Sequence, residues 1–411
     1  MNTWEESNLT RRLYWENPYL FETDAKIERI DNNEEGFQVT LDRSIFYPDM
    51  SGGQPGDDGT INSVNVIRTY EDGDNLVHVV RERLALGKAN LRISGERRMD
   101  LMQQHSGQHL LSGVLFRLFG TETIGFHLGE EYTTIDLNVP DVSEDELTRA
   151  EQLCNKIIQS NFRIKSYVVS SDEVRLLPVR KRPSVDKNIR VVEIDGFDYS
   201  PCGGTHVAAT GELGLLKVIR SEKYKGNTRI YFLTGKRAVD DYINKFNSVR
   251  DISAVLSTGD TQVFERFSAI YNERNSLLKD MKELKEKLLS LEGENLLRGT
   301  KLHGEGRIIC KMFDNKDFKE VSYMGNWLTN TNERLVLIFG IEGSSISQFM
   351  ISKSKDVELE LNDIYKELSS LYQIKGGGNS NTVQGSISSS HLNGLLERCL
   401  ELVMKAMDQK K

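Results

Sequence analysis

The feature that most constrains the fold of this chain is a heptad repeat between Val263 and Leu291. Apolar residues recur there in alternating steps of four and three, interrupted only by Arg274, and Lys and Glu are abundant between them. This pattern is typical of one continuous helix with an apolar edge. At about 1.5 Å per residue, such a helix spans roughly 43 Å, which is longer than a small domain is wide. We therefore expect a spacer between an N-terminal and a C-terminal module. The seam residues are Val263, Phe267, Ile270, Arg274, Leu277, Met281, Leu284, Leu288 and Leu291.

The sequence leaves two interpretations of this apolar edge open. In the first, the edge packs on an earlier helix of the same chain, between about Val239 and Leu256. In the second, it pairs with the same edge of a second copy, so that the chain forms a homodimer through a coiled coil. The two arrangements can coexist.

Composition narrows the class of protein. Hydrophobic residues make up 38% of the 411 residues and charged residues 28%, which is enough to build two to four folded domains. We expect no membrane span, because no apolar run approaches about 18 residues. The net charge of −8 excludes a globally basic nucleic-acid binder but leaves room for a local basic groove. Four scattered cysteines and an N-terminus without a secretory signal favour a reduced, cytoplasmic setting.

The pattern along the chain predicts an α+β multidomain protein. Residues 1–92 read as short strands and turns, which indicates a β-barrel-like domain with a Gly-rich loop. Residues 93–238 mix helices and strands in an α+β core, and residues 239–299 form the helical spacer. Residues 300–411 mix strands and helices again, which indicates a C-terminal α/β domain.

Two short motifs predict a metal centre in the α+β core. His105 and His109 are four residues apart on a predicted helix, so both imidazoles lie on one face. Cys202 and His206 have the same spacing in a turn, where two glycines allow the backbone to bend them together. One thiolate and three imidazoles are ligands that a tetrahedral Zn²⁺ prefers, so we expect one zinc ion per chain. The leucines of the same helix are expected on its opposite face.

Basic residues are dense around Arg180, Lys181 and Arg182, and these side chains are candidates for phosphate contacts, although a solvated surface explains them as well. His127 follows the predicted metal helix and is a candidate for lining the cleft.

The motifs together resemble a known family. The segment from Gln104 to Leu111 and the segment from Cys202 to His206 look like the editing module of alanyl-tRNA synthetase. That module also occurs in threonyl-tRNA synthetase and in free-standing alanyl-tRNA editing proteins. The loop 46–59 resembles the Gly-rich motif that precedes the module. The segment 375–379 resembles the glycine loop of the family's C-terminal domain, which DHH-type phosphoesterases share. The order and extent of the motifs resemble a long-form, free-standing editing protein of the AlaX type.

This resemblance implies an aminoacyl-tRNA deacylase that acts in trans on tRNA for alanine carrying serine or glycine. It implies His105, His109, Cys202 and His206 as zinc ligands. It also implies an RNA-binding role for the C-terminal glycine loop, made of Gly376, Gly377, Gly378 and Asn379. The alternative is a zinc-containing tRNA-binding protein without catalysis. A phosphoesterase is disfavoured because the chain contains no Asp-His-His triplet.

The residues allow a mechanism without a covalent intermediate. Because no Ser-His-Asp or Cys-His nucleophile pairing is apparent, we favour direct attack of water on the ester. Gln108 is a candidate donor that selects a serine hydroxyl, and a solvent-facing glutamine is the alternative. Gly52, Gly53 and Gln54 are candidates for approaching the tRNA terminus, and a plain surface turn is the alternative. The sequence does not choose between a catalytic and a structural zinc ion.

Overall fold

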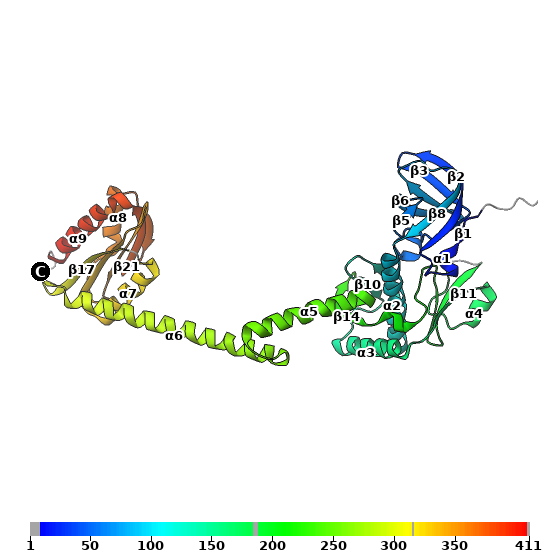
Figure 1. Cartoon of the computed structure of the whole chain (residues 1–411). Coiled ribbons are helices and arrows are strands. Elements are labelled where there is room, and N and C mark those ends of the chain that lie inside the picture. Colours follow the sequence, from blue (N-terminus) through cyan, green and yellow to red (C-terminus); the bar gives the residue numbers. More distant parts are fainter. Residues whose placement is uncertain (1–8, 184–187, 315, 409–411) are drawn as a thin grey trace, which may run out of the picture. The chain divides into compact units, whose positions relative to one another are not determined.

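The computed structural model describes residues 9–183, 188–314 and 316–408, and it divides the chain into two compact units, Met1–Ile252 and Ser253–Lys411. The boundary falls within a helix that starts at Gly235 (Figure 1). In the described part of the chain, no helix is both long and apolar enough to cross a membrane.

The first unit begins with a small barrel. A short parallel pair lies beside it, formed by β1 (Arg11–Arg12) and β4 (Arg43–Ser44), and α1 (Leu13–Glu16) follows β1. The barrel strands, in spatial order, are β2 (Glu22–Asn33), β3 (Gly36–Leu41), β7 (Asn75–Val80), β6 (Val64–Asp72), β5 (Gly59–Ile61) and β8 (Gly87–Ile93). The barrel closes because β8 pairs with β2. Val39, Phe46 and Leu91 are among the side chains that fill it.

The Gly-rich loop leaves the barrel between β4 and β5. It contains the short 3-10 helix η1 (Ser51–Gly53), in which Gly52 and Gly53 have φ values of 57° and 79°. Glycine adopts these left-handed conformations without steric cost, so the loop can turn back sharply toward the rest of the unit.

The α+β part of the first unit is built around α2 (Gly95–Phe119). Ser94 caps its start and Gly120, with a φ of 68°, ends it. This part also contains two antiparallel sheets and several further helices. The larger sheet has the order β14 (Leu216–Tyr224), β15 (Asn227–Thr234), β10 (Thr133–Leu137), β9 (Thr123–Leu128). The smaller sheet has the order β11 (Ile164–Val169), β12 (Ile189–Ile194), β13 (Asp198–Pro201). The helices are α3 (Glu144–Ser160), α4 (Ser171–Leu176), η2 (Thr210–Leu213) and α5 (Gly235–Leu256).

The two faces of α2 have different surroundings. The leucines were expected to pack on the core, on the side opposite the two histidines. Leu110, Leu111, Val114 and Leu115 do lie in the core. The opposite face is buried as well, since His105 and His109 have 0% and 5% of their surface exposed. The helix is covered on both sides because the barrel loop and the segment after β13 pack over its polar face.

The second unit contains η3 (Asp260–Gln262) and the heptad helix, α6 (Val263–Arg298). Most of the apolar seam is exposed, including Leu284 and Leu288 at 65% each. Only the C-terminal part of α6 packs inward, through Leu289 and Gly293, against α7 (Phe318–Thr331). The seam itself therefore lies on a different face of α6 from the one that contacts the rest of its unit.

A six-stranded sheet forms the centre of the second unit (Figure 1). Its order is β16 (Leu302–His303), β17 (Gly306–Phe313), β18 (Leu335–Ile341), β19 (Ile346–Lys353), β21 (Thr382–Ser388), β20 (Lys375–Gly378). Only the β17–β18 pair is parallel. One face packs against α7, and the other packs against α8 (Leu361–Leu371) and α9 (Leu392–Asp408), which follows the short η4 (Ser389–His391).

The predicted C-terminal glycine loop is an edge strand. Gly376, Gly377 and Gly378 form most of β20 and pair with β21. The pairing of backbone N–H and C=O groups with β21 makes extended structure favourable for a sequence whose glycines suggested a loop. Asn379 follows the strand, and its side chain accepts hydrogen bonds from the backbone N–H groups of Asn381 and Thr382.

Candidate metal centre

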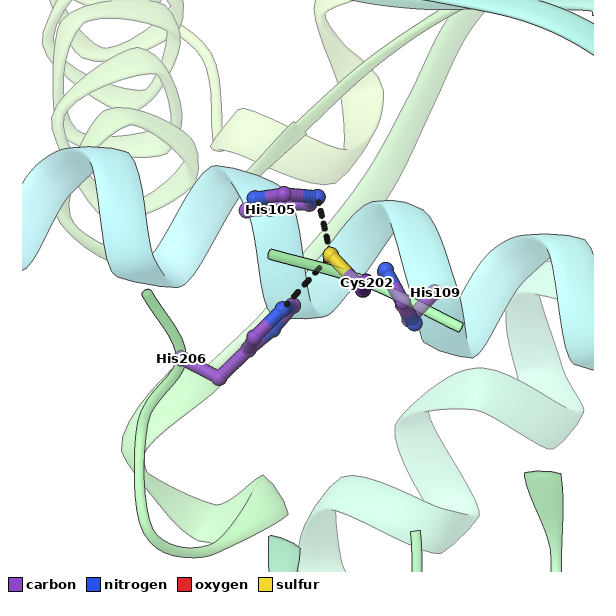
Figure 2. A group of neighbouring side chains, drawn as sticks. All are labelled: His105, His109, Cys202 and His206. Carbon is purple, nitrogen blue, oxygen red and sulfur yellow. Dashed lines mark hydrogen bonds between the residues drawn. The ribbon is translucent and has the colours of Figure 1, made fainter. Parts of the chain in front are cut away.

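Four side chains from two segments of the first unit converge on one point (Figure 2). His105 and His109 project from α2, and Cys202 and His206 project from the segment after β13. One ligand-type atom from each residue lies within 4.8 Å of the others. The Sγ atom of Cys202 is 3.4 Å from Nε2 of His105 and 3.4 Å from Nε2 of His206.

Arg190 and Trp15 donate hydrogen bonds to three backbone carbonyl oxygens of the segment from Cys202 to His206. Arg190, on β12, donates hydrogen bonds to the carbonyl oxygens of Cys202 and Gly204 at 2.8 and 2.9 Å. The indole N–H of Trp15 donates to the carbonyl oxygen of Gly203 at 2.8 Å. A Cβ atom at Gly204 would lie 2.2 Å from Cε1 of His105, so only glycine lets the segment approach the imidazole this closely.

Hydrogen bonds on the far side of the rings orient two of the imidazoles. Nδ1 of His105 lies 2.8 Å from Oε1 of Gln54, in the barrel loop. Nδ1 of His206 lies 3.0 Å from Oγ of Ser106, which also accepts the backbone N–H of Val207. Both rings therefore present Nε2 to the thiol. Such outer contacts fix the orientation of ligands in known metal sites.

The imidazole of His109 lies in a different environment. Nδ1 of His109 is buried without a hydrogen-bond partner, and Oδ2 of Asp198 lies 4.0 Å away. Asp198 is itself paired with the guanidinium group of Arg180 and accepts a hydrogen bond from Ser200.

Burial keeps the three imidazoles neutral. Loss of hydration lowers the pKa of His109 to about 3 and lowers the pKa values of His105 and His206 well below the usual value, with neighbouring cations adding to the effect. Burial also raises the pKa of the Cys202 thiol, while the Gly204 N–H and Arg190 act in the opposite direction. Neutral imidazole is the form that binds metal ions.

The four side chains fit a tetrahedral metal ion. Ligand bonds of about 2.0–2.3 Å imply ligand-to-ligand distances of about 3.3–3.7 Å in a tetrahedron. The two 3.4 Å separations of Cys202 from the histidines agree with this geometry. Among the residues that the structure describes, this is the one group of three or more His, Cys, Asp and Glu side chains with metal-binding proximity.

The cluster lies beside two cavities of the first unit. The smaller cavity, of about 450 Å³, is lined by residues that include Gln108, Ile124 and Lys181. The larger cavity, of about 1090 Å³, is lined by residues that include Trp15, Arg190 and Cys202. His109, Phe126 and Pro201 line both. A ligand can therefore approach the cluster from two sides.

Gln108 and His127 differ in their relation to these cavities. Gln108 is buried rather than solvent-facing, lines the smaller cavity, and donates its amide N–H to Oγ of Ser112 at 2.9 Å. His127, expected in the cleft, has an exposed side chain and lines neither cavity. It follows Phe126 on β9, and successive residues of a strand point to opposite faces.

The three consecutive basic residues, Arg180, Lys181 and Arg182, also differ in their surroundings. Arg180 lines the smaller cavity but is engaged with Asp198 and Ser200. Lys181 lines the same cavity, and both Lys181 and Arg182 are exposed.

The Gly-rich loop faces inward at its end. Gly52 lines the larger cavity, and Gly53 lies so close to Phe126 that a Cβ atom would be 2.8 Å from its ring. Gln54 has no exposed surface, so its side chain points into the first unit. In the second unit, Gly376, Gly377 and Gly378 line a cavity of about 540 Å³ with Phe318 and Gln348.

Sequence reasoning missed the residues that support the cluster. Ser106 lies within the histidine motif and carried a local signal, because a hydroxyl next to a predicted ligand is a natural hydrogen-bond partner. Trp15, Arg190 and Asp198 are brought to the site by tertiary structure, and their sequence positions gave no comparable signal.

Comparison with known proteins shows which domain class part of this site lies in. Residues 189–231 match the family model described as "Threonyl and Alanyl tRNA synthetase second additional domain". The matched segment carries Cys202 and His206, so half of the candidate metal centre belongs to a domain of that class.

Relatives extend the likeness to nearly the whole chain. The alanyl-tRNA editing protein AlaX-L of Pyrococcus horikoshii is 32% identical over 396 residues, covering 93% of this chain and 95% of that protein. The chain therefore belongs to the family of alanyl-tRNA editing proteins. Aarsd1 of Mus musculus is 33% identical, covering 65% of this chain and 63% of its own length. The alanine–tRNA ligase of Ignicoccus hospitalis is 30% identical, and the match covers 90% of this chain but 40% of the ligase.

A solved structure gives a weaker match. The C-Ala domain of Aquifex aeolicus alanyl-tRNA synthetase matches 26% of this chain and 95% of that domain, with 15% identity and a TM-score of 0.23.

Proposed function

We propose that this protein hydrolyses the ester bond of tRNA for alanine that carries the wrong amino acid, serine or glycine, and that it does so in trans. The observation that carries this proposal is the cluster of His105, His109, Cys202 and His206 beside two cavities. Membership of the alanyl-tRNA editing family supports the same conclusion.

One Zn²⁺ ion per chain is the proposed cofactor, held by these four side chains. When bound with an accessible coordination position, zinc supplies Lewis acidity and lowers the pKa of a bound water molecule. The protein's own contribution is to keep the imidazoles neutral through burial and to hold the thiol between two of them.

Gln108 is the proposed selector of the amino acid. It lines the smaller cavity next to His109, and one N–H of its amide is used by Ser112. A primary amide has a second N–H and a carbonyl oxygen, so Gln108 has further capacity to bind a serine hydroxyl group. This role predicts a preference for serine over glycine that weakens when Gln108 is shortened.

The tRNA would be held by backbone contacts and exposed cations. Lys181 and Arg182 are proposed phosphate contacts because their side chains are exposed and Lys181 lines the smaller cavity. Gly52, on the larger cavity, offers a backbone N–H group that a nucleotide can approach closely. Arg180 is proposed to hold Asp198 in place rather than to contact a phosphate, because its guanidinium group is already paired with that carboxylate.

The second unit has a proposed role in binding rather than in chemistry. The glycine edge strand β20 and Asn379 are proposed to contact tRNA, and the exposed seam of α6 is proposed to pair two copies of the chain. Two linked binding modules raise affinity through effective concentration. Removing residues from Val239 onward should therefore weaken tRNA binding more than it slows hydrolysis at saturation.

The decisive experiment uses the purified full-length chain and tRNA for alanine charged with serine, glycine or alanine. We expect hydrolysis of the seryl ester, slower hydrolysis of the glycyl ester, and an intact alanyl ester. A zinc-loaded protein that binds the charged tRNA and leaves all three esters intact would be a non-catalytic tRNA-binding protein, and the proposal would fail.

A further inference from the structure

The Gly-rich loop of the barrel is anchored to α2 upstream of the metal centre. Arg98 and Asp57 form an ion pair whose two side chains have no exposed surface. Arg98 also donates to the carbonyl oxygens of Pro18 and Ile45, at 2.9 and 2.6 Å. Asp57 accepts the backbone N–H of Tyr47 at 2.7 Å. Because this network is fully buried, the loop is held firmly against the helix that carries His105 and His109.

Gln54 is the residue that this loop delivers to the cluster. Its Oε1 atom accepts the backbone N–H of Thr205 at 3.1 Å, and its Nε2 atom donates to Oγ1 of Thr205 at 2.9 Å. A backbone N–H can only donate, so the atom that faces it must be the amide oxygen rather than the nitrogen. The orientation of the Gln54 amide is therefore fixed by its neighbours.

That orientation determines the state of one histidine. The same Oε1 atom lies 2.8 Å from Nδ1 of His105. Because an amide oxygen only accepts, Nδ1 must carry the hydrogen, and the lone pair of the neutral ring is then on Nε2. Nε2 is the atom that faces Cys202.

We propose that Gln54 is a positioning residue for the metal centre. It holds His105 in the Nδ1–H tautomer and in the ring orientation that presents the Nε2 lone pair to the metal ion. This inference rests on the proposed zinc-dependent function. It gives the end of the Gly-rich loop a structural role, which is to orient the buried imidazole of His105. Outer hydrogen bonds of this kind typically contribute 10- to 100-fold to metal affinity in proteins.

Three substitutions separate this role from a general effect on packing. Gln54→Leu removes both the acceptor for His105 and the contacts with Thr205. Gln54→Glu replaces the amide oxygen with a carboxylate oxygen, which can still accept from Nδ1 of His105 and from Thr205. Gln104→Leu is the matched control, because Gln104, on α2, is fully buried like Gln54 but forms its hydrogen bonds with Asp100, Thr133 and Thr234 rather than with the four cluster residues.

The first measurement is metal affinity, by competition with a chromophoric zinc chelator, together with the absorption spectrum of the Co²⁺-substituted protein. We expect Gln54→Leu to bind zinc about 10- to 100-fold more weakly with an altered Co²⁺ spectrum. We expect Gln54→Glu and Gln104→Leu to stay within a few-fold of the wild type. Equal affinity and equal spectra for Gln54→Leu and the wild type would overturn the proposal, as would equal losses in all three variants.

The second measurement needs no metal. In metal-free protein labelled with ¹⁵N-histidine, the nitrogen chemical shifts of His105 should identify the Nδ1–H tautomer in the wild type and a loss of that preference in Gln54→Leu. An Nε2–H tautomer in the wild type would refute the inference. A wild type that binds no zinc, or that binds zinc without hydrolysing seryl-tRNA, would instead refute the proposed function, so the two failures are distinguishable.

Discussion

The two longest helices in the described part of the chain, α2 and α6, place polar and apolar side chains in opposite ways. α2 buries polar groups such as Arg98, Gln104 and His105, and each of these three has hydrogen-bond partners. α6 exposes most of a heptad seam and buries only Leu289 and Gly293. Buried polar groups need partners because their desolvation is costly, whereas an exposed apolar seam is typical of a surface that binds another molecule. The comparison supports the proposal that α2 carries the chemistry and that α6 carries the association.

The largest expected effect comes from removing a side chain of the cluster. Cys202→Ala and His109→Ala should each reduce seryl-tRNA hydrolysis to the uncatalysed background, because the loss of a ligand removes the metal ion or its geometry. The measurement is the initial rate of deacylation together with zinc content by atomic emission. Near wild-type turnover in a variant that has lost its metal would show that the chemistry does not depend on zinc.

The next largest effect is expected from a substitution of a buried polar residue of α2. Arg98→Met should lower the free energy of unfolding by about 3–5 kcal/mol, since it leaves the Asp57 carboxylate buried without its partner. Urea unfolding followed by circular dichroism measures the loss. Arg97→Met is the control, because Arg97 is only partly buried and its nearest carboxylate, on Asp58, is largely exposed. Similar losses in the two variants would contradict the importance that we assign to the buried pair.

A smaller effect depends on pH and on a buried imidazole in the barrel. His78 accepts a hydrogen bond from Ser44 and donates one to the Val39 carbonyl oxygen, and burial lowers its pKa to about 4 from 6.5. Because the folded state favours the neutral ring, the contribution of His78 to the free energy of unfolding is complete above pH 6.5. That contribution is lost as the pH falls from 6.5 toward 4. The difference in pKa corresponds to about 3 kcal/mol.

The variant His78→Phe removes this titration. Its stability should fall less steeply than that of the wild type between pH 6.5 and pH 4, although it loses two hydrogen bonds at neutral pH. Unfolding free energies measured across this pH range provide the test. Parallel pH profiles for the two proteins would mean that His78 does not contribute to acid sensitivity.

The smallest effect is expected from a substitution in the exposed apolar seam of α6. Leu284→Glu should weaken self-association at least tenfold, or about 1.4 kcal/mol, while changing the stability of the single chain by less than about 0.5 kcal/mol. Sedimentation analysis over a range of concentrations measures the first quantity. Lys282→Ala, on the same helix outside the seam, is the control. A wild type that stays monomeric throughout would remove the homodimer from the proposed function.

Local patterns predicted part of this molecule well. The spacing of His105 and His109 and the glycines after Cys202 act over a few residues, so the convergence of the four side chains could be anticipated. Gln54, Asp198 and Trp15 reach the cluster only through contacts between distant segments, which periodicity does not encode. The glycines of β20 suggested a loop because their conformational preference is weak, and pairing with β21 determined the outcome.

The buried pair of Arg98 and Asp57 has a consequence for how the first unit unfolds. The barrel and the core around α2 form one compact unit, and this pair joins the barrel loop to the helix at a point that water does not reach. Opening the barrel alone would strand the Arg98 charge in a low-dielectric surrounding, so partial unfolding at this junction is strongly disfavoured. The two parts are therefore expected to melt in a single calorimetric transition, and severing the chain near Ser94 should yield two fragments that each lack an independent native state.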